Sequence, residues 1–512
     1  MEKISVHEIL FTKIIATLGP SSNTPEIIGE LIHEGARAFR INFSHGSFDE
    51  YEKTLKNIKE AEVVTGIPVA VIGDLSGPKI RIGKVAGNGV LLKHGMKVIF
   101  TDEDLVTEPE SEPVVFSTSF PGFIKEVKKG QKILLDDGNV MLRCVTPATN
   151  TERKLICEVV EGGLITSRKG VNLPDTELSV SAITPRDREC IAFAVRHKYN
   201  FLALSFVRRA EDLRELKEIM RAEGARPGKV LGDHPTGIDV SLLKGDYEGL
   251  IPIIAKIEKP QALDDLDNIL KETDFVMIAR GDLGVEMDLA EVAVHQKNII
   301  QRCREYSVPV IVATQMLQSM IESPVPTRAE VSDVANAIYD GADAIMLSGE
   351  TAVGKWPVEA VRMMKRIAEK TNDDMVRRSL EFPSPGKVIE LKGRSAGIAS
   401  GARMLARDSG AKLIANWTEL GGSALFLSQQ RMHLPVISFS HNLHTLRILA
   451  LLYGIIPVRM NKPATKMEFI HTTVQVLSDD GLAAKGDTIV FVNRYPFDKV
   501  GLTNELTVHS IE

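Results

Sequence analysis

The sequence of 512 residues has few cysteines, no excess of basic residues and no long hydrophobic run. The four cysteines, Cys144, Cys157, Cys190 and Cys303, form no C-x-x-C pair, which is typical of reduced thiols in a cytosolic protein. The net charge of -6 lacks the basic excess of a nucleic-acid-binding protein. No apolar run reaches the roughly 18–20 residues that span a bilayer, and residues 1–10 lack the apolar core of a signal peptide. The sequence therefore predicts a cytoplasmic protein that binds neither nucleic acid nor membrane.

Short apolar runs alternate with amphipathic helical patterns in two parts of the chain. Near-continuous apolar runs separated by helices are typical of a buried parallel sheet. About eight such runs predict an α/β fold with a (β/α)₈ TIM barrel, built from residues 1–82 and 179–381. The runs lie at residues 13–19, 38–46, 69–77, 201–207, 251–258, 275–284, 308–316 and 344–351.

Several helix starts carry a capping signal. Thr24 is followed by Pro25, which fits the first position of a helix. The segments 47–50 (SFDE) and 327–330 (TRAE) both match the capping box, in which the first side chain and the fourth cap each other's backbone amides. Helices are therefore expected to begin at about residues 25, 48 and 328.

Two further regions differ from the barrel pattern. Residues 83–178 contain short strand-like runs with Gly and Asp turns, which predict a small inserted β-barrel domain that could close over the site as a lid. Residues 387–512 alternate helices and strands again, which predicts a C-terminal α/β domain. The Gly- and Pro-rich segment 224–249 is expected to be an insertion on the face opposite the active site, without a chemical role.

Charged residues gather where the predicted strands end, the rim on which barrel enzymes carry their chemistry. Lys256 and Glu258 are two residues apart on one strand and therefore point to the same side. Asp282 follows the next strand, so two carboxylates and one ammonium converge. Two hard oxygen ligands suit Mg²⁺ or Mn²⁺, and the lysine could stabilise charge on a transferred group. The alternative is a structural ion pair between Lys256 and Glu258.

A series of distinctive strings extends over nearly the whole chain. They are KIIATLGP, RINFSHG, GDLSGPKIR, RKGVNLP, AKIEKP, ARGDLG, ATQML, PTRAEVSDVANA and IMLSGETA. In this order the strings resemble the pyruvate kinase family. The resemblance implies a barrel, a mobile β lid and a C-terminal regulatory domain, usually in a homotetramer. It also implies transfer of a phosphoryl group from phosphoenolpyruvate to ADP, the final step of glycolysis.

The resemblance assigns roles to individual residues. Lys256 would stabilise the phosphoryl transition state and the enolate, and Arg40 would bind the phosphate. Glu258 and Asp282 would bind the divalent metal. The remaining residues implied at the substrate are Gly281 beside the metal, Thr314 at the methylene carbon, and Ser348 and Glu350 in the proton relay.

The resemblance also implies a nucleotide site, formed by Asn42, Ser44, His45, Arg81 and the lid residue Lys169. Three of the assigned residues have plain structural alternatives: Thr314 as a strand-end residue, Ser348 as a helix cap and His45 as an ordinary residue at a helix start.

The segment that contains Lys79 departs from the family. Members that require potassium resemble one another in having a threonine at the position of Leu75 and a glutamate at the position of Lys79. A fixed ammonium from Lys79 could replace the monovalent cation, so we expect independence from potassium. A K⁺ site could still be framed by Asn42, Ser44, Asp74 and the Leu75 carbonyl. Alternatively, Lys79 pairs with a surface acid.

The C-terminal domain contains a Gly-rich loop that resembles the family's phosphate-binding effector loop. Such a loop at the start of a helix offers free amides to a phosphate. Leu420 replaces a common hydroxyl residue, so the effector, a sugar phosphate if there is one, is left open. The loop residues implied are Thr418, Gly421, Gly422 and Ser423.

Two other functions stay open from the sequence. A carbon–carbon lyase of 2-oxo acids could use the same metal–enolate chemistry, but it would not require ADP. A non-catalytic metabolite sensor could keep the fold, but it would be expected to lose Lys256, Glu258 or Asp282.

Overall fold

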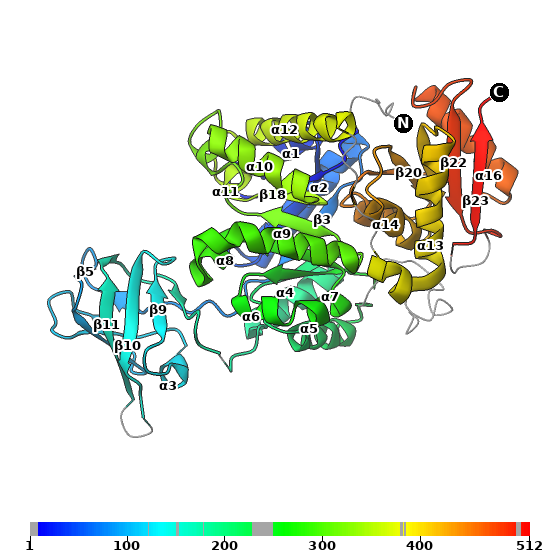
Figure 1. Cartoon of the computed structure of the whole chain (residues 1–512). Coiled ribbons are helices and arrows are strands. Elements are labelled where there is room, and N and C mark those ends of the chain that lie inside the picture. The colour runs from blue at the N-terminus through cyan, green and yellow to red at the C-terminus, as the bar shows by residue number, and fades with distance from the viewer. Residues whose placement is uncertain are drawn as a thin grey trace.

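Eight parallel strands close into a barrel at the centre of the molecule (Figure 1). The computed structural model describes residues 9–120, 122–149, 153–177, 179–227, 249–378, 382, 386–497 and 503–512. Around the barrel the strands follow the order β1-β18-β17-β16-β15-β14-β3-β2. Seven strands lie within the predicted apolar runs, and β2 begins two residues before its run, so the predicted barrel is confirmed. The bounds are β1 (Lys13–Thr17), β2 (Ala36–Asn42), β3 (Ala70–Asp74), β14 (Phe201–Leu204), β15 (Ile253–Ile257), β16 (Phe275–Ala279), β17 (Val310–Ala313) and β18 (Ala344–Leu347).

The interior of the barrel is a packed core. Residues such as Ile15, Phe201, Phe275 and Met277 point inward and have no exposed surface. A second core lies between the strands and the surrounding helices. Seven of the eight strands are buried on both faces, so they read as continuous apolar runs in the sequence, whereas β2 has partly buried polar residues.

The helices of the barrel begin where the sequence predicted. Thr24 caps α1 (Pro25–His33), and complete capping boxes begin α2 (Phe48–Thr65) and α10 (Arg328–Asp340). The other helices of this region are α4 (Pro185–Arg196), α5 (Ala210–Ala222), α6 (Pro260–Asp264), α7 (Leu266–Glu272), α8 (Arg280–Glu286), α9 (Leu289–Glu305), η4 (Gln318–Ile321), α11 (Gly349–Ala352) and α12 (Pro357–Arg377).

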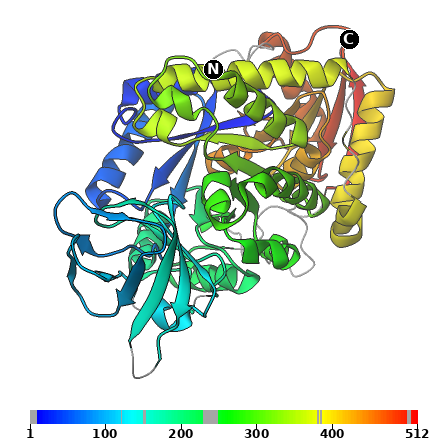
Figure 2. The ribbon, with the colours of Figure 1, turned by 60° about the vertical axis from the view of Figure 1, so that its left-hand side comes forward.

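The inserted β domain follows β3 and projects from the barrel (Figures 1 and 2). Its strands form a six-stranded sheet, β13-β9-β10-β11-β6-β8, and two short ladders, β12-β5 and β4-β7. Among the described residues these strands surround one apolar core. Gly87 and Gly89 adopt positive φ values and end the short strands. The bounds are β4 (Lys84–Val85), β5 (Val90–Leu92), β6 (Lys97–Thr101), β7 (Val106–Thr107), β8 (Val114–Phe116), α3 (Phe123–Glu126), β9 (Lys132–Leu135), β10 (Val140–Thr146), β11 (Lys154–Glu161), β12 (Gly163–Ile165) and β13 (Val171–Asn172).

The C-terminal part of the chain forms a five-stranded sheet in the order β21-β20-β19-β22-β23. Four strands are parallel, and β23 joins the edge antiparallel to β22. The predicted α/β domain is therefore present, with one strand that the sequence reading missed. Its elements are α13 (Gly386–Asp408), β19 (Leu413–Trp417), α14 (Gly422–Gln429), β20 (Val436–Ser440), α15 (Leu443–Leu449), β21 (Ile455–Arg459), α16 (Lys466–Asp479), β22 (Thr488–Asn493) and β23 (Glu505–Ser510).

This domain packs against the end of the barrel at which the strands begin. Lys13, the first residue of β1, donates from Nζ to the carbonyl oxygen of Ile455 at 2.8 Å. Asp343, which precedes β18, forms a fully buried ion pair with Arg431 at 2.8 Å. The lid follows the end of β3 and therefore belongs to the opposite face, where the strands end.

Three further expectations concern the rest of the chain. Of the insertion expected at 224–249, residues 228–248 lie outside the described residues, but the flanking Leu250 contacts His444 of the C-terminal domain. All four cysteines are buried and unpaired. In the described part of the chain, no helix has the length and apolar character needed to cross a membrane.

Candidate active site

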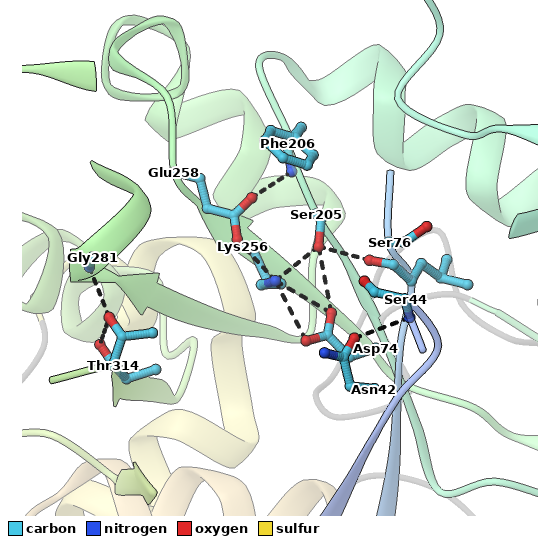
Figure 3. Close-up of polar contacts among 12 residues, drawn as sticks. Asn42, Ser44, Asp74, Ser76, Ser205, Phe206, Lys256, Glu258, Gly281 and Thr314 are labelled. Atoms are coloured by element: carbon cyan, nitrogen blue, oxygen red, sulfur yellow. Dashed lines mark hydrogen bonds and ion pairs between the residues drawn. The ribbon is translucent and has the colours of Figure 1, made fainter. Parts of the chain in front are cut away.

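Lys256 lies at the centre of a buried charge cluster at the rim where the strands end (Figure 3). Its Nζ atom is 2.8 Å from Glu258 Oε1 and 3.3 Å from Asp74 Oδ1. It also donates to Ser205 Oγ at 2.8 Å. The ion pair between Lys256 and Glu258 that the sequence left as an alternative is therefore present, but it is one part of a larger cluster from three strands.

The protonation of this cluster follows from burial and charge. Burial alone lowers the pKa of Lys256, but Asp74 and Glu258 outweigh it, and the net pKa is raised. Burial raises the pKa of Glu258, Lys256 lowers it, and the charge of Asp282 raises it further. For Asp74, burial raises the pKa, but Lys256 and Arg40 lower it below its ordinary value. A further cation would relieve the repulsion between Glu258 and Asp282.

Arg40 reaches this cluster from β2. Its Nε atom donates to Asp74 Oδ2 at 2.6 Å, and its Nη1 atom donates to Thr17 Oγ1 at 3.2 Å. In the described part of the structure, Nη2 has no hydrogen-bond partner. The guanidinium is thus fixed by a buried carboxylate while one edge is left to bind an anion.

Asp282 and Gly281 lie in the first turn of the short helix α8, directly after β16. The backbone N–H of Gly281 donates to Thr314 Oγ1 at 2.7 Å (Figure 3). Thr314 follows β17 and has a φ of 69°, which is a rare backbone conformation for a β-branched residue. Such strain costs about 1–3 kcal/mol and often marks a functional site, so the plain strand-end alternative explains Thr314 less well.

Glu350 and Ser348 lie just beyond β18. The fully buried carboxylate of Glu350 accepts the backbone N–H groups of Leu317 at 3.0 Å and of Ser348 at 2.8 Å. It therefore joins the loops after β17 and β18. Ser348 Oγ is buried without a hydrogen-bond partner among the described residues, and it makes no side-chain cap to α11. The capping alternative is thus not what holds this serine in place.

The residues suggested for a monovalent cation lie beside Asp74. Asn42 Oδ1 accepts the backbone N–H of Ser44 at 3.1 Å, and the Leu75 carbonyl accepts Ser205 Oγ at 2.7 Å. Two oxygens of the suggested frame therefore already have a donor. Lys79 is exposed on the segment that leads into the lid. Among the described residues, its side chain forms no ion pair with a surface acid.

The suggested nucleotide residues come from both the lid and the barrel. Lys169 in the lid is 2.7 Å from Asp136 Oδ1, and Arg81 Nη1 donates to the carbonyl oxygen of Arg168 at 3.0 Å. His45 is exposed in the loop between β2 and α2. A cleft of about 330 Å³ between lid and barrel brings several of these groups to one surface. Lys79, Arg81, Asp136, Lys169 and Asp282 all line it.

The Gly-rich loop of the C-terminal domain precedes α14. Gly421, at a φ of 92°, donates its N–H to Thr418 Oγ1 at 2.9 Å, and Ser423 Oγ accepts from Asn416 at 3.0 Å. Gly422 is the first residue of the helix. Glu419 places a carboxylate in the same loop, 3.0 Å from Lys462. Any phosphate here would therefore meet a negative charge as well as the loop amides.

Two residues of the cluster were missed in the sequence. Ser205 bridges Lys256 and the Leu75 carbonyl, and Phe206, with a φ of 57°, donates its N–H to Glu258 Oε2 at 2.8 Å. Both directly follow β14, so their place at a strand end was the available signal. Among the described residues, no group of three or more His, Cys, Asp or Glu side chains could hold a metal ion. Glu258 and Asp282 would thus supply only part of a coordination shell.

Two protein-family models match the chain. The model described as "Pyruvate kinase, barrel domain" covers residues 10–232 and 239–361, and the one described as "Pyruvate kinase, alpha/beta domain" covers residues 396–509. The chain is 39% identical over 502 residues to a pyruvate kinase of Thermotoga maritima, with 98% of this chain and 99% of that protein covered. It is 38% identical over 502 residues to a pyruvate kinase of Corynebacterium glutamicum, with 97% of each covered. The crystal structure of a pyruvate kinase from Cryptosporidium parvum superimposes with a TM-score of 0.86 at 30% identity, covering 99% of this chain and 98% of that one.

Proposed function

The chain belongs to the pyruvate kinase family of phosphotransferases, and from this premise we propose how its site transfers a phosphoryl group from phosphoenolpyruvate to ADP. The observation that carries the proposal is the cluster of Lys256, Glu258 and Asp74 beside Asp282 at the barrel rim. In the reaction, the P–O bond of phosphoenolpyruvate breaks and a terminal oxygen of ADP bonds to phosphorus. The enolate that remains takes up a proton at its methylene carbon and becomes pyruvate.

Lys256 is the residue that stabilises negative charge during the transfer. Its raised pKa keeps the ammonium charged throughout the neutral range. Its neighbours hold the Nζ atom in place, so little reorganisation is required when charge develops on the phosphoryl group and the enolate oxygen. Arg40 binds the phosphate with the guanidinium edge that Asp74 and Thr17 leave open.

Glu258 and Asp282 would hold the divalent metal, Mg²⁺ or Mn²⁺. Two carboxylates fit Mg²⁺, which leaves its other positions to water and substrate oxygens. The raised pKa of Glu258, partly caused by Asp282, also fits a pair of carboxylates that share a cation. When bound, the metal would neutralise charge on the phosphate and carboxylate oxygens of the substrate.

Thr314, Ser348 and Glu350 belong to the path of the proton. A threonine hydroxyl is too weak an acid to supply the proton itself, so it passes on a proton from water or a neighbouring group. The hydroxyl of Ser348, which has no hydrogen-bond partner among the described residues, and the carboxylate of Glu350 lie on the adjoining loop, which supports one shared network. Glu350 contributes by fixing the two loop amides that orient this network.

The lid supplies part of the nucleotide site. Lys169 and Arg81 line the cleft together with Asp282. Asn42, Ser44 and His45, at the end of β2 and in the loop that follows it, would complete the nucleotide site from the barrel. Closure of residues 83–178 over 1–82 and 179–381 would move Lys169 to the nucleotide phosphates and exclude water.

The enzyme acts without potassium. Lys79 is exposed on the segment that leads into the lid and forms no ion pair with an acid among the described residues, which leaves its ammonium available as the substitute charge. Asn42 Oδ1 and the Leu75 carbonyl oxygen each already accept a hydrogen bond, which supports an enzyme that does not rely on these oxygens to bind K⁺. In its cellular setting we assign the chain to the cytoplasm as a homotetramer, with residues 387–512 as the regulatory domain. The loop of Thr418, Gly421, Gly422 and Ser423 would bind a sugar-phosphate effector.

The requirement for ADP tests this proposal against the lyase. Pyruvate should form from phosphoenolpyruvate and Mg²⁺ only when ADP is present, with one ATP for each pyruvate. Pyruvate formed without ADP would point to different chemistry. No turnover with ADP, at any concentration of added sugar phosphate, would favour a metabolite sensor.

A further inference from the structure

Thr314 and Gln315 both adopt left-handed backbone conformations, with φ values of 69° and 54°. Neither residue is a glycine or asparagine, so the local sequence does not favour this turn. The turn sets the direction of the Thr314 carbonyl and side chain. Contacts from elsewhere in the fold must therefore hold it in place.

The side chain of Arg280 provides those contacts. Arg280 is the first residue of α8, and it is only 8% exposed. Its Nη2 atom donates to the carbonyl oxygens of Thr314 at 3.0 Å and of Gln315 at 3.4 Å. Its Nη1 atom donates to Asp333 Oδ1 at 2.8 Å and to Gln296 Oε1 at 3.4 Å. One buried guanidinium thus binds both carbonyls of the turn, while Gln296 of α9 and Asp333 of α10 bind its other terminal nitrogen.

The next residue of α8 holds the other end of the threonine. The Gly281 N–H donates to Thr314 Oγ1 at 2.7 Å, and that hydroxyl donates to the carbonyl oxygen of Ala313 at 2.6 Å (Figure 3). Arg280 and Gly281 therefore fix the carbonyl and the hydroxyl of Thr314 from the same helical turn. Asp282, the proposed metal ligand, is the following residue in that turn.

We propose that Arg280 is a positioning residue for the proton-transfer step, acting through Thr314. The inference rests on the proposed function and adds a residue to it. By holding both carbonyls of the strained turn, Arg280 keeps the Thr314 hydroxyl aligned with the substrate carbon. Without it the turn is free to relax to an ordinary conformation. The far end of α8 keeps a separate anchor, because Glu286 pairs with Lys259 at 2.5 Å. Loss of the Arg280 contacts should therefore affect proton transfer more than metal binding or phosphoryl transfer.

The two steps can be measured separately in Arg280→Met and Arg280→Lys. The proton step is followed by NMR, as deuterium entering the methyl group of pyruvate in D₂O with ATP and Mg²⁺. Here a C–H bond of pyruvate breaks, the proton leaves through the relay, and a deuteron from solvent returns. Phosphoryl transfer is followed as ATP formed from phosphoenolpyruvate and ADP in the first turnover, by quenched flow. Arg302→Met is the matched control, because Arg302 on α9 pairs with Asp267 and does not contact Thr314.

We expect Arg280→Met to slow deuterium exchange by about 10- to 100-fold, since a misplacement near 1 Å costs about that much. First-turnover ATP formation should stay within about threefold of wild type, and Arg280→Lys should recover part of the exchange because an ammonium can still reach one carbonyl. Equal losses in both steps, or no loss of exchange, would overturn the inference. Failure of the wild-type protein to form ATP would instead reject the proposed function.

Discussion

Replacing Lys256 with methionine removes the one ammonium that the carboxylates of Glu258 and Asp74 share. At the 2.8 Å separation of Lys256 and Glu258 and an effective dielectric constant of about 20, the gross attraction is roughly 6 kcal/mol. The substitution also removes the free-energy cost of burying the lysine charge, which offsets part of this lost attraction. We therefore expect a net loss of stability of about 3–5 kcal/mol, typical of a buried pair that loses one partner. The loss of transition-state stabilisation should lower kcat by at least about 10²–10³-fold.

The pH dependence of the variant follows from Glu258. Burial raises the pKa of Glu258 and Lys256 lowers it, so the substitution should raise this pKa further. An acid with a raised pKa in the folded state binds more protons there than when unfolded, so stability falls as pH rises from 4.5 to the folded pKa. The deficit of Lys256→Met relative to wild type should therefore be larger at pH 8 than at pH 5.

Urea unfolding at the two pH values and steady-state kinetics measure these effects. Lys13→Met is the matched control, because Lys13 is a buried lysine at the opposite end of the barrel. The control should keep kcat within about threefold of wild type, as expected for a residue that does not touch the reacting groups. A Lys256→Met protein that turns over at the wild-type rate would refute the role given to this ammonium. A stability deficit that is the same at both pH values would refute the coupling to Glu258.

Lys79→Glu should lower activity in buffer free of K⁺, and added K⁺ should restore part of that activity. The control Lys84→Glu, a few residues further along the chain, should show no response to K⁺. An equal response in both variants would contradict the role of Lys79 as a substitute for the cation. Burial, and then the nearby charge of Arg37, lower the pKa of Lys13 to about 7. The folded state therefore binds fewer protons than the unfolded state between that value and 10.5, so stability should rise with pH across this window in wild type but not in Lys13→Met, as followed by urea unfolding. Glu350→Ala leaves the backbone amides of Leu317 and Ser348 without an acceptor and should destabilise the fold by about 2–4 kcal/mol, measured by calorimetry. A change below about 0.5 kcal/mol would contradict a structural role for these two hydrogen bonds.

The barrel could be predicted because its signals are local. All strands but β2 are buried on both faces and so read as apolar runs. The capping boxes at Ser47 and Thr327 are complete within four residues. The edge strand β23 (Glu505–Ser510) was missed because its mixed, partly exposed residues carry no such pattern. The convergence of Lys256, Glu258 and Asp282 could be predicted from their places at strand ends.

Other features of the site depend on contacts between distant segments. Ser205 has no distinctive sequence signal, and its importance appears only when it bridges Lys256 and the Leu75 carbonyl. The left-handed turn at Thr314 depends on the side chain of Arg280, which is 34 residues earlier in the chain. The sequence alone does not show such a turn, because nothing near Thr314 favours it.

Phosphoryl transfer without potassium can be measured by incubating the protein with phosphoenolpyruvate, ADP and Mg²⁺ in buffer free of Na⁺ and K⁺. Pyruvate and ATP are measured together before and after K⁺ is added. We expect equal amounts of both products, at a rate that K⁺ does not change. A rate that appears only with K⁺ would contradict the role of Lys79 but keep the phosphotransferase. Pyruvate without ATP, or no product in either buffer, would contradict the proposed reaction itself.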